Sequence, residues 1–221
     1  MMFDDSGAAE RPGISAVDAL ERLRAGNRRF VSGVRSLDTF VGQARRREFV
    51  TGQKPFAVIL GCSDSRVPVE IVFDQGLGDL FVIRVAGNIV APSQIGSVEF
   101  AADRFGTRLV VVLGHTRCGA VQATLEELQP STAMPSRHLS SIVDRIRPSV
   151  EALLATPLRH DRDALAQHAV RANVRVSANA LRHGSRVLER LTQSDGLRVV
   201  GAEYSLETGG VDFFDGLPVA D

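Results

Sequence analysis

Three short, uninterrupted apolar runs constrain most strongly how this chain folds. They are Phe56–Leu60, Leu80–Ile83 and Leu109–Leu113, and a glycine directly follows the first and the third. Strands that are apolar at every position, rather than at alternate positions, are typical of parallel sheets covered on both faces. Stretches long enough for helices separate the runs, at about 67–73 and 94–105. This alternation predicts an α/β fold with right-handed crossovers.

The rest of the chain adds helices and one antiparallel edge. Helical patterns are expected at 17–31, 39–50, 139–154 and 162–193, and from Cys118 to about Leu128, with a kink or break at Pro148. Residues 197–204 indicate a further strand, and 211–214 the return arm of a hairpin around Gly209 and Gly210. We therefore expect a central sheet of about four parallel strands with an antiparallel edge strand, flanked by helices and preceded by an N-terminal helical arm.

Composition and charge exclude several classes of protein. With 221 residues, of which 44% are hydrophobic, the chain buries a core without disulfides, so disordered, fibrous and disulfide-scaffold classes are excluded. The 26 basic and 26 acidic residues cancel, which argues against nucleic acid as a partner and is compatible with an oligomer. Lys54 is the only lysine, and this bias towards arginine suggests a bacterial genome rich in GC. No signal sequence or membrane span is recognisable, so we expect a cytoplasmic protein without a membrane partner.

Residue types that carry chemistry follow two of the apolar runs. Cys62-Ser-Asp-Ser-Arg66 comes after the first run, and His115-Thr-Arg-Cys118 after the third. Ligands of doubly wound sheets bind beyond the carboxyl ends of the strands, so we expect these segments to lie close together. Two thiolates and one imidazole, from Cys62, Cys118 and His115, are a ligand set that suits a catalytic zinc ion with its fourth position open to water.

Each of these residues also has a simpler explanation. Cysteine is among the most buried residue types, so either thiol alone indicates core packing. A lone His115 indicates a hydrogen-bonded core histidine, and Asp64 with Arg66 alone indicates an ion pair within a turn. The spacing by itself therefore leaves both a metal site and buried core residues open. A phosphate loop at 114–119 is excluded, because Ala120 stands where that motif requires lysine.

Together the two motifs resemble the paired signature of bacterial β-class carbonic anhydrases, and the similarity extends over about residues 16–214. The resemblance implies reversible hydration of carbon dioxide to bicarbonate and a proton by a zinc-bound hydroxide. It assigns one zinc ion per chain to Cys62, His115 and Cys118. Asp64 would orient the hydroxide, and Arg66 would hold Asp64 ionised and aimed. The family's bicarbonate-stabilised closed state uses a tryptophan, and this chain has none; we therefore expect the open form.

The same resemblance implies which residues form the substrate slot. Gln53, nine residues before Cys62, would donate a hydrogen bond to a substrate oxygen, and Phe81 would form an apolar wall. Ala86 and Phe100 would complete the slot. Phe100 stands where many relatives have tyrosine, so a hydroxyl is lost there, and Ala86 replaces a bulkier aliphatic side chain of some relatives.

Assembly and domain organisation follow from the resemblance as well. It implies a homodimer or a tetramer built from dimers, with slots shared between subunits. Residues 1–50 would form an N-terminal arm that packs on a partner subunit, and 51–221 the zinc-binding α/β catalytic domain. Two other functions stay open: a zinc-dependent hydrolase of carbon disulfide or carbonyl sulfide on the same scaffold, and a non-enzymatic zinc or thiol redox module.

Overall fold

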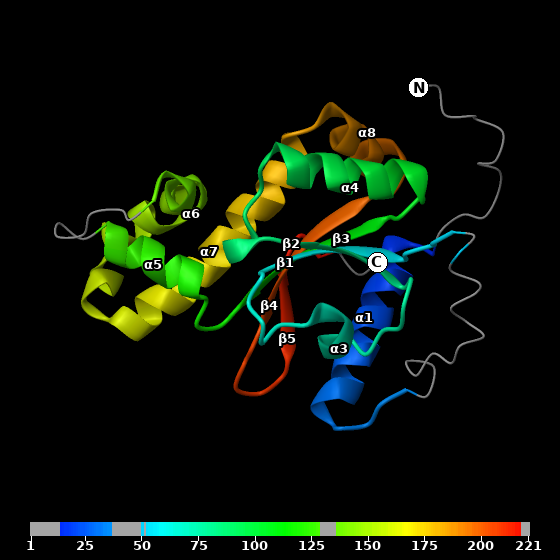
Figure 1. Cartoon of the computed structure of the whole chain (residues 1–221), viewed down its shortest axis with the longest axis horizontal. Coiled ribbons are helices and arrows are strands. Elements are labelled where there is room, and N and C mark those ends of the chain that lie inside the picture. The colour runs from blue at the N-terminus through cyan, green and yellow to red at the C-terminus, as the bar shows by residue number, and fades with distance from the viewer. Residues whose placement is uncertain (1–13, 37–49, 51, 129–135, 218–221) are drawn as a thin grey trace.

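The computed structural model describes residues 14–36, 50, 52–128 and 136–217. Within these ranges, five strands form one sheet in the order β2-β1-β3-β4-β5 (Figure 1). The strands are β1 (Ala57–Gly61), β2 (Leu80–Arg84), β3 (Leu109–His115), β4 (Arg198–Tyr204) and β5 (Val211–Asp215). The first four pair in parallel, and β5 pairs antiparallel with β4 at the edge. The predicted α/β fold, with four parallel strands and an antiparallel edge strand, is confirmed.

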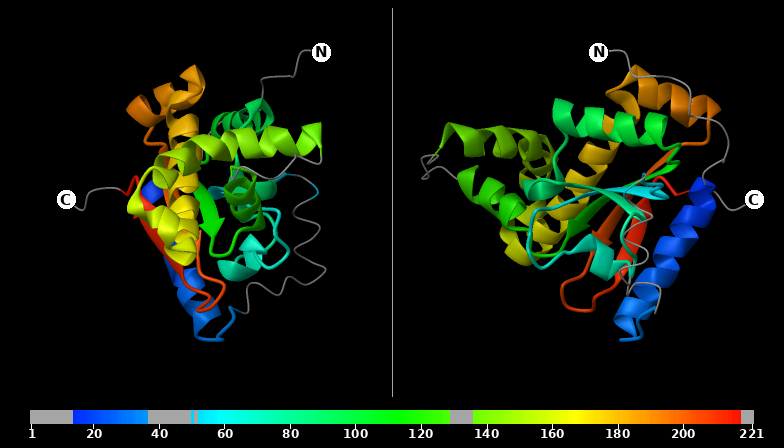
Figure 2. Two further views of the ribbon diagram at one scale, coloured as in Figure 1. Left: turned by 90° about the vertical axis from the view of Figure 1, so that its left-hand side faces the viewer. Right: turned by 45° about the vertical axis from the view of Figure 1, so that its right-hand side comes forward.

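Helices cover both faces of the sheet (Figures 1 and 2). They are α1 (Ala16–Val31), α3 (Val69–Val72), α4 (Pro92–Arg104), α5 (Gly119–Glu127), α6 (Arg137–Leu154), α7 (Arg162–His183) and α8 (Arg186–Ser194). Ala57 and Ile59 of β1 face the core shared with α1 and α3, while Val58 and Leu60 face the core shared with α4, α7 and α8. Every residue of β1 is therefore buried, which explains its continuous apolar run.

Two of the predicted helices differ in detail from the structure. The segment predicted as helical over 162–193 is two helices, because Ser185 ends the run and its side chain accepts hydrogen bonds from the first turn of α8. Pro148 does not end α6, which continues to Leu154. Pro148 and Asp144, whose carbonyl loses its helical partner, are both exposed, so water can satisfy that carbonyl. The helix predicted at 39–50 falls almost entirely outside the described residues.

Helix α1 packs on the chain's own sheet with some, but not all, of the apolar residues in the helical pattern at 17–31. Leu20 and Leu23 are buried as expected, but Val17 and Val31 are 51% and 52% exposed. Gly26 and Asn27 are buried in the contact instead. Gly26 has no side chain, which allows α1 to approach the Phe73 carbonyl closely. The Asn27 Nδ2 amide donates to the carbonyls of Val72 and Gly209, and its Oδ1 accepts from the Val211 amide. Apolar periodicity could not reveal a contact made by a glycine and an amide.

We expect Gly26→Ala to destabilise the fold by about 1–3 kcal/mol or more, because the new Cβ would collide with the Phe73 carbonyl oxygen. Gly96→Ala is the matched control, since Gly96 also lies inside a helix and a Cβ there has nothing within 4 Å. This control should stabilise the protein by about 0.5–1 kcal/mol. Urea unfolding of both variants measures the difference. Equal effects would show that α1 docks less tightly than described.

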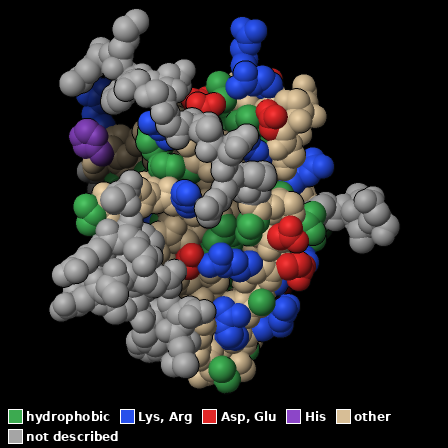
Figure 3. All heavy atoms as spheres, turned by 90° about the vertical axis from the view of Figure 1, so that its right-hand side faces the viewer, with side chains coloured by type: hydrophobic (Ala, Val, Ile, Leu, Met, Phe, Trp, Pro, Cys, Tyr) green, Lys and Arg blue, Asp and Glu red, His purple; other side chains and the backbone are tan. Residues whose placement is uncertain are grey.

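None of the helices in the described part of the chain combines the length and the apolar character that crossing a membrane requires. On the face at the right-hand side of Figure 1, acidic and basic side chains are interspersed (Figure 3). This mixture agrees with the net charge of zero.

Candidate metal centre

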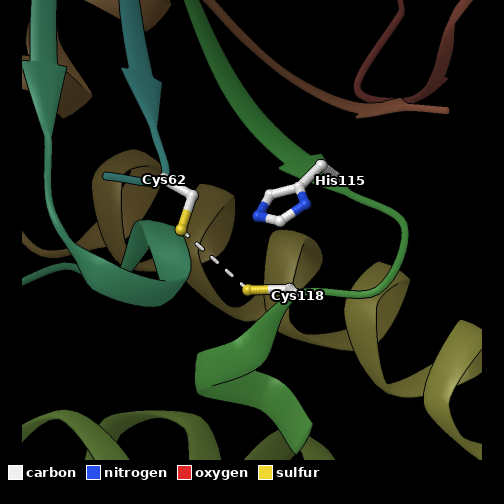
Figure 4. A group of neighbouring side chains, drawn as sticks. All are labelled: Cys62, His115 and Cys118. Carbon is white, nitrogen blue, oxygen red and sulfur yellow. Dashed lines mark hydrogen bonds between the residues drawn. The ribbon is translucent and has the colours of Figure 1, made fainter. Parts of the chain in front are cut away.

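The carboxyl ends of β1 and β3 bring Cys62, His115 and Cys118 together (Figure 4). Cys62 directly follows β1, His115 is the last residue of β3, and Cys118 precedes the first turn of α5. The potential ligand atoms of the three buried side chains all lie within 4.8 Å of one another. The two sulfur atoms are 4.0 Å apart. The convergence predicted from the two motifs is therefore present in the fold.

The His115 ring has one satisfied nitrogen and one unsatisfied nitrogen. Its Nδ1 lies 2.9 Å from the Thr116 carbonyl oxygen, which can only accept, so Nδ1 carries the proton and donates. The buried Nε2 then holds a lone pair, and it has no hydrogen-bond partner among the residues that the structure describes. A buried, unpartnered acceptor is costly in a folded protein. A metal ion is the kind of partner that such a nitrogen accepts.

The two thiols favour a single negative charge between them. The hydrogen bond from Cys118 lowers the pKa of Cys62 to about 4, and the Gly87 amide, 3.3 Å from the Cys62 sulfur, contributes in the same direction. The pKa of Cys118 is raised well above its usual value, first by its hydrogen bond to Cys62 and then by burial. A divalent cation would stabilise both thiolates at once. Two thiolates and one imidazole lone pair fit a zinc ion.

Asp64 and Arg66 form a two-pronged ion pair beside this cluster. Arg66 Nε lies 2.9 Å from Asp64 Oδ1, and Nη2 lies 2.7 Å from Oδ2. These hydrogen bonds hold the pKa of the Asp64 carboxyl well below its usual range. Asp64 Oδ2 also lies 3.8 Å from His115 Nε2. An ionised carboxylate, turned towards arginine, therefore stands next to the unpartnered imidazole nitrogen.

The predicted slot residues are only partly brought to this cluster. Ala86 lies in the short helix η2 (Ala86–Asn88), next to the glycine that contacts Cys62. Gln53 is exposed and precedes β1, whereas Cys62 follows β1. Because a five-residue strand spans roughly 16 Å, Gln53 and Cys62 lie at opposite ends of this strand. Phe81 and Phe100 instead pack with Phe105, with ring centroids 5.4–6.3 Å apart, between β2 and α4. Within one chain, a slot formed by all four residues is not assembled.

Arg84 also belongs to the site, although no role was predicted for it. Its Nε donates to the Cys62 carbonyl at 3.1 Å and its Nη2 to the Asp64 carbonyl at 2.6 Å. Arg84 therefore clamps the backbone of the loop that presents both side chains. Its place depends on the register of β1 and β2, in which Gly61 pairs with Arg84. No local pattern in the sequence signals that register.

Comparisons with known proteins agree with this geometry. A family model described as carbonic anhydrase matches residues 57–211. Carbonic anhydrase 2 of Mycobacterium tuberculosis is 39% identical over 199 residues, covering 90% of this chain and 92% of its own. The solved β-carbonic anhydrase of Aspergillus fumigatus superimposes with a TM-score of 0.69 at 29% identity, covering 79% and 82% of the two chains. A tetrameric β-carbonic anhydrase of Sordaria macrospora shares the fold, with a TM-score of 0.68 at 24% identity over 79% and 87%.

Proposed function

Because this chain belongs to the β-carbonic anhydrase family, we propose that it hydrates carbon dioxide reversibly to bicarbonate and a proton, in the bacterial cytoplasm, at the Cys62, His115 and Cys118 cluster. The observation that carries this proposal is the buried set of two thiols and one imidazole, whose Nε2 has no partner in the described structure. The relatives reported above are carbonic anhydrases, which favours carbon dioxide over the sulfur analogues and over a non-enzymatic module.

One zinc ion per chain would be held by Cys62, His115 and Cys118. When bound, zinc would lower the pKa of a water molecule so that hydroxide is available near neutral pH. The protein's part is to present three ligands from a buried and rigid setting. The hydrogen bond from His115 Nδ1 to the Thr116 carbonyl keeps Nε2 free for the metal. The Arg84 clamp keeps the loop that carries Cys62 in register.

Asp64 would act as the residue that orients the nucleophile. Its carboxylate stays ionised, because Arg66 donates to both of its oxygens. An ionised carboxylate can only accept hydrogen bonds, so Asp64 would take one from the attacking water and direct a lone pair of that water towards carbon dioxide. Arg66 is then a positioning residue that acts through Asp64.

The remaining slot residues point to a shared site. Phe100 is 53% exposed and packs on Phe81, so an aromatic cluster lies at the surface of one chain. We propose that this cluster, with Gln53, meets the metal centre of a partner chain and supplies the apolar wall that uncharged carbon dioxide needs. Ala86, beside Gly87, would line the slot within its own chain.

The test of the proposed function is a carbon dioxide hydration assay on metal-free and zinc-loaded protein across a pH series. We expect the rate to rise in proportion to bound zinc, up to one ion per chain. Carbon disulfide and carbonyl sulfide are tested on the same samples. Full activity of the metal-free protein would refute the proposal, and turnover of the sulfur compounds alone would favour the alternative hydrolase.

We expect a dimer, or a tetramer built from dimers, in sedimentation at micromolar concentration. The inner face of α1 packs on its own sheet, but the exposed Val17 and Val31 on its outer face are apolar positions that a partner would cover. This agrees with the proposal that the N-terminal arm, residues 1–50, contacts a second subunit. The Sordaria macrospora relative is tetrameric. A strictly monomeric species that is fully active would contradict both the shared slot and this assembly.

A further inference from the structure

The Cys62 sulfur accepts a hydrogen bond from a turn whose left-handed backbone favours glycine. The donor is the Gly87 amide, 3.3 Å away. Gly87 has a φ of +69°, and a Cβ there would lie 2.7 Å from Ile146 Cδ1 and 3.1 Å from Ala120 Cβ. A flexible residue can hold a hydrogen bond to sulfur only if the surrounding structure fixes its orientation. Gly87 therefore needs a second contact that fixes its orientation.

Asn173 of α7 holds the other polar group of the same residue. Its side chain is 1% exposed, and its Nδ2 donates to the Gly87 carbonyl at 2.8 Å. Gly87 is thus bonded on both sides, with its N–H to the sulfur and its carbonyl to Asn173. No role beyond its place in a helix was predicted for Asn173.

Helix α7 is a rigid base for this contact. It packs so closely on β3 that a Cβ at Gly114, the residue before His115, would lie 2.6 Å from Val174 Cγ2 and 3.2 Å from Val170 Cγ1. Asn173 lies between these two valines in the sequence. One turn of α7 therefore contacts both parts of the site: Val170 and Val174 pack on the end of β3 that carries His115, and Asn173 bonds the Gly87 turn that contacts Cys62.

We propose that Asn173 is a positioning residue of the metal centre, which acts through Gly87 to fix the hydrogen bond to Cys62 and thereby sets how strongly Cys62 binds the metal. The inference rests on the proposed zinc site. An N–H group that donates to a thiolate fixes the orientation of the sulfur lone pairs, as the outer hydrogen-bond partners of metal ligands do. Without Asn173, the buried Gly87 carbonyl would lack its partner, and the turn would rotate to find another, carrying the N–H away from the sulfur.

Only one of the two polar groups of the Asn173 amide has a hydrogen-bond partner among the described residues. Asn173 Oδ1 is buried and has no hydrogen-bond partner among the described residues. An unsatisfied buried polar atom is unfavourable, and an apolar side chain of similar shape would avoid it. A purely structural role, in which Asn173 only satisfies the buried Gly87 carbonyl, predicts that removing the donor lowers stability without changing zinc affinity. The experiment exploits this difference.

The test compares Asn173→Leu and Asn173→Ala with the wild-type protein. Both variants lack the donor; leucine fills the site and alanine leaves it partly empty. Zinc affinity is measured by chelator competition, and the thiolate-to-cobalt absorption bands are recorded after Co²⁺ substitution. We expect both variants to bind zinc about tenfold more weakly, the lower end of the 10–100-fold range for outer partners of metal ligands, with shifted cobalt bands.

Ser177→Ala is the matched control, because Ser177 is buried one turn further along α7. We expect this control to keep the wild-type zinc affinity and cobalt spectrum. Spectra at saturating Co²⁺ remain informative for a variant whose apoprotein is unstable, since the bound metal favours the folded form. Asn173 variants that lose thermal stability but keep the wild-type affinity and bands would overturn the inference. Absence of zinc binding by the wild-type protein would instead refute the proposed function.

Discussion

Cys62→Ser is expected to abolish zinc binding and to reduce carbon dioxide hydration to the uncatalysed background. A serine hydroxyl stays protonated at neutral pH and is a poor zinc ligand, so only His115 and Cys118 would remain of the three-ligand set. Enzymes typically accelerate reactions by about 10⁶-fold or more, so the expected loss of rate is of that order. Metal content and hydration rate are measured on the same preparation.

Ser63→Ala is the control for a change in the same loop, because Ser63 is adjacent and exposed. It should keep one zinc ion per chain and the wild-type rate. If Cys62→Ser retains a full complement of zinc, the metal lies elsewhere and the cluster at the ends of β1 and β3 has another purpose. If it loses zinc but keeps its rate, the reaction does not need the metal.

The sheet and the ligand cluster could be predicted because their signals are local. A strand covered on both faces must be apolar throughout, so β1 and β3 can be recognised in the sequence as uninterrupted apolar runs. Cys62 and His115 stand at the ends of these runs, and the carboxyl ends of neighbouring parallel strands lie side by side. Their meeting therefore follows from the fold class together with the pairing of β1 and β3.

The contacts that were missed depend on registers and packing that no short segment encodes. Arg84 reaches the Cys62 loop only because β2 pairs with β1 in one particular register. Asn173 reaches Gly87 across 86 positions of sequence, and it does so through a backbone carbonyl, which carries no residue signature. Phe81 and Phe100 were expected in the slot beside the metal centre, but in one chain they pack with each other, an aromatic contact between β2 and α4 that no local pattern signals.

Asp64→Asn is expected to keep zinc and to lower the hydration rate by roughly 10²–10³-fold. Asparagine has nearly the same shape, but its amide oxygen is a weaker acceptor than a charged carboxylate and its NH₂ group is a donor. The loss of one oriented, charge-assisted contact corresponds to roughly 2–4 kcal/mol of barrier. An ion pair that only stabilised the turn would predict a lower melting temperature with the rate per zinc unchanged.

Arg66 variants test whether Asp64 must be held as well as ionised. Arg66→Ala is expected to slow hydration about as much as Asp64→Asn, because the two hydrogen bonds from the Arg66 side chain to the Asp64 carboxylate are lost. Asp64 Oδ2 already lies 3.8 Å from His115 Nε2, so a freed carboxylate can turn towards the metal ligands and compete for the open position. The variant should then bind zinc at least as tightly as the wild type while turning over less.

Arg66→Lys should restore only part of the rate, because an ammonium group cannot donate to both oxygens in one plane. Near-normal turnover per zinc in Asp64→Asn would refute the orienting role, whatever the melting temperatures show.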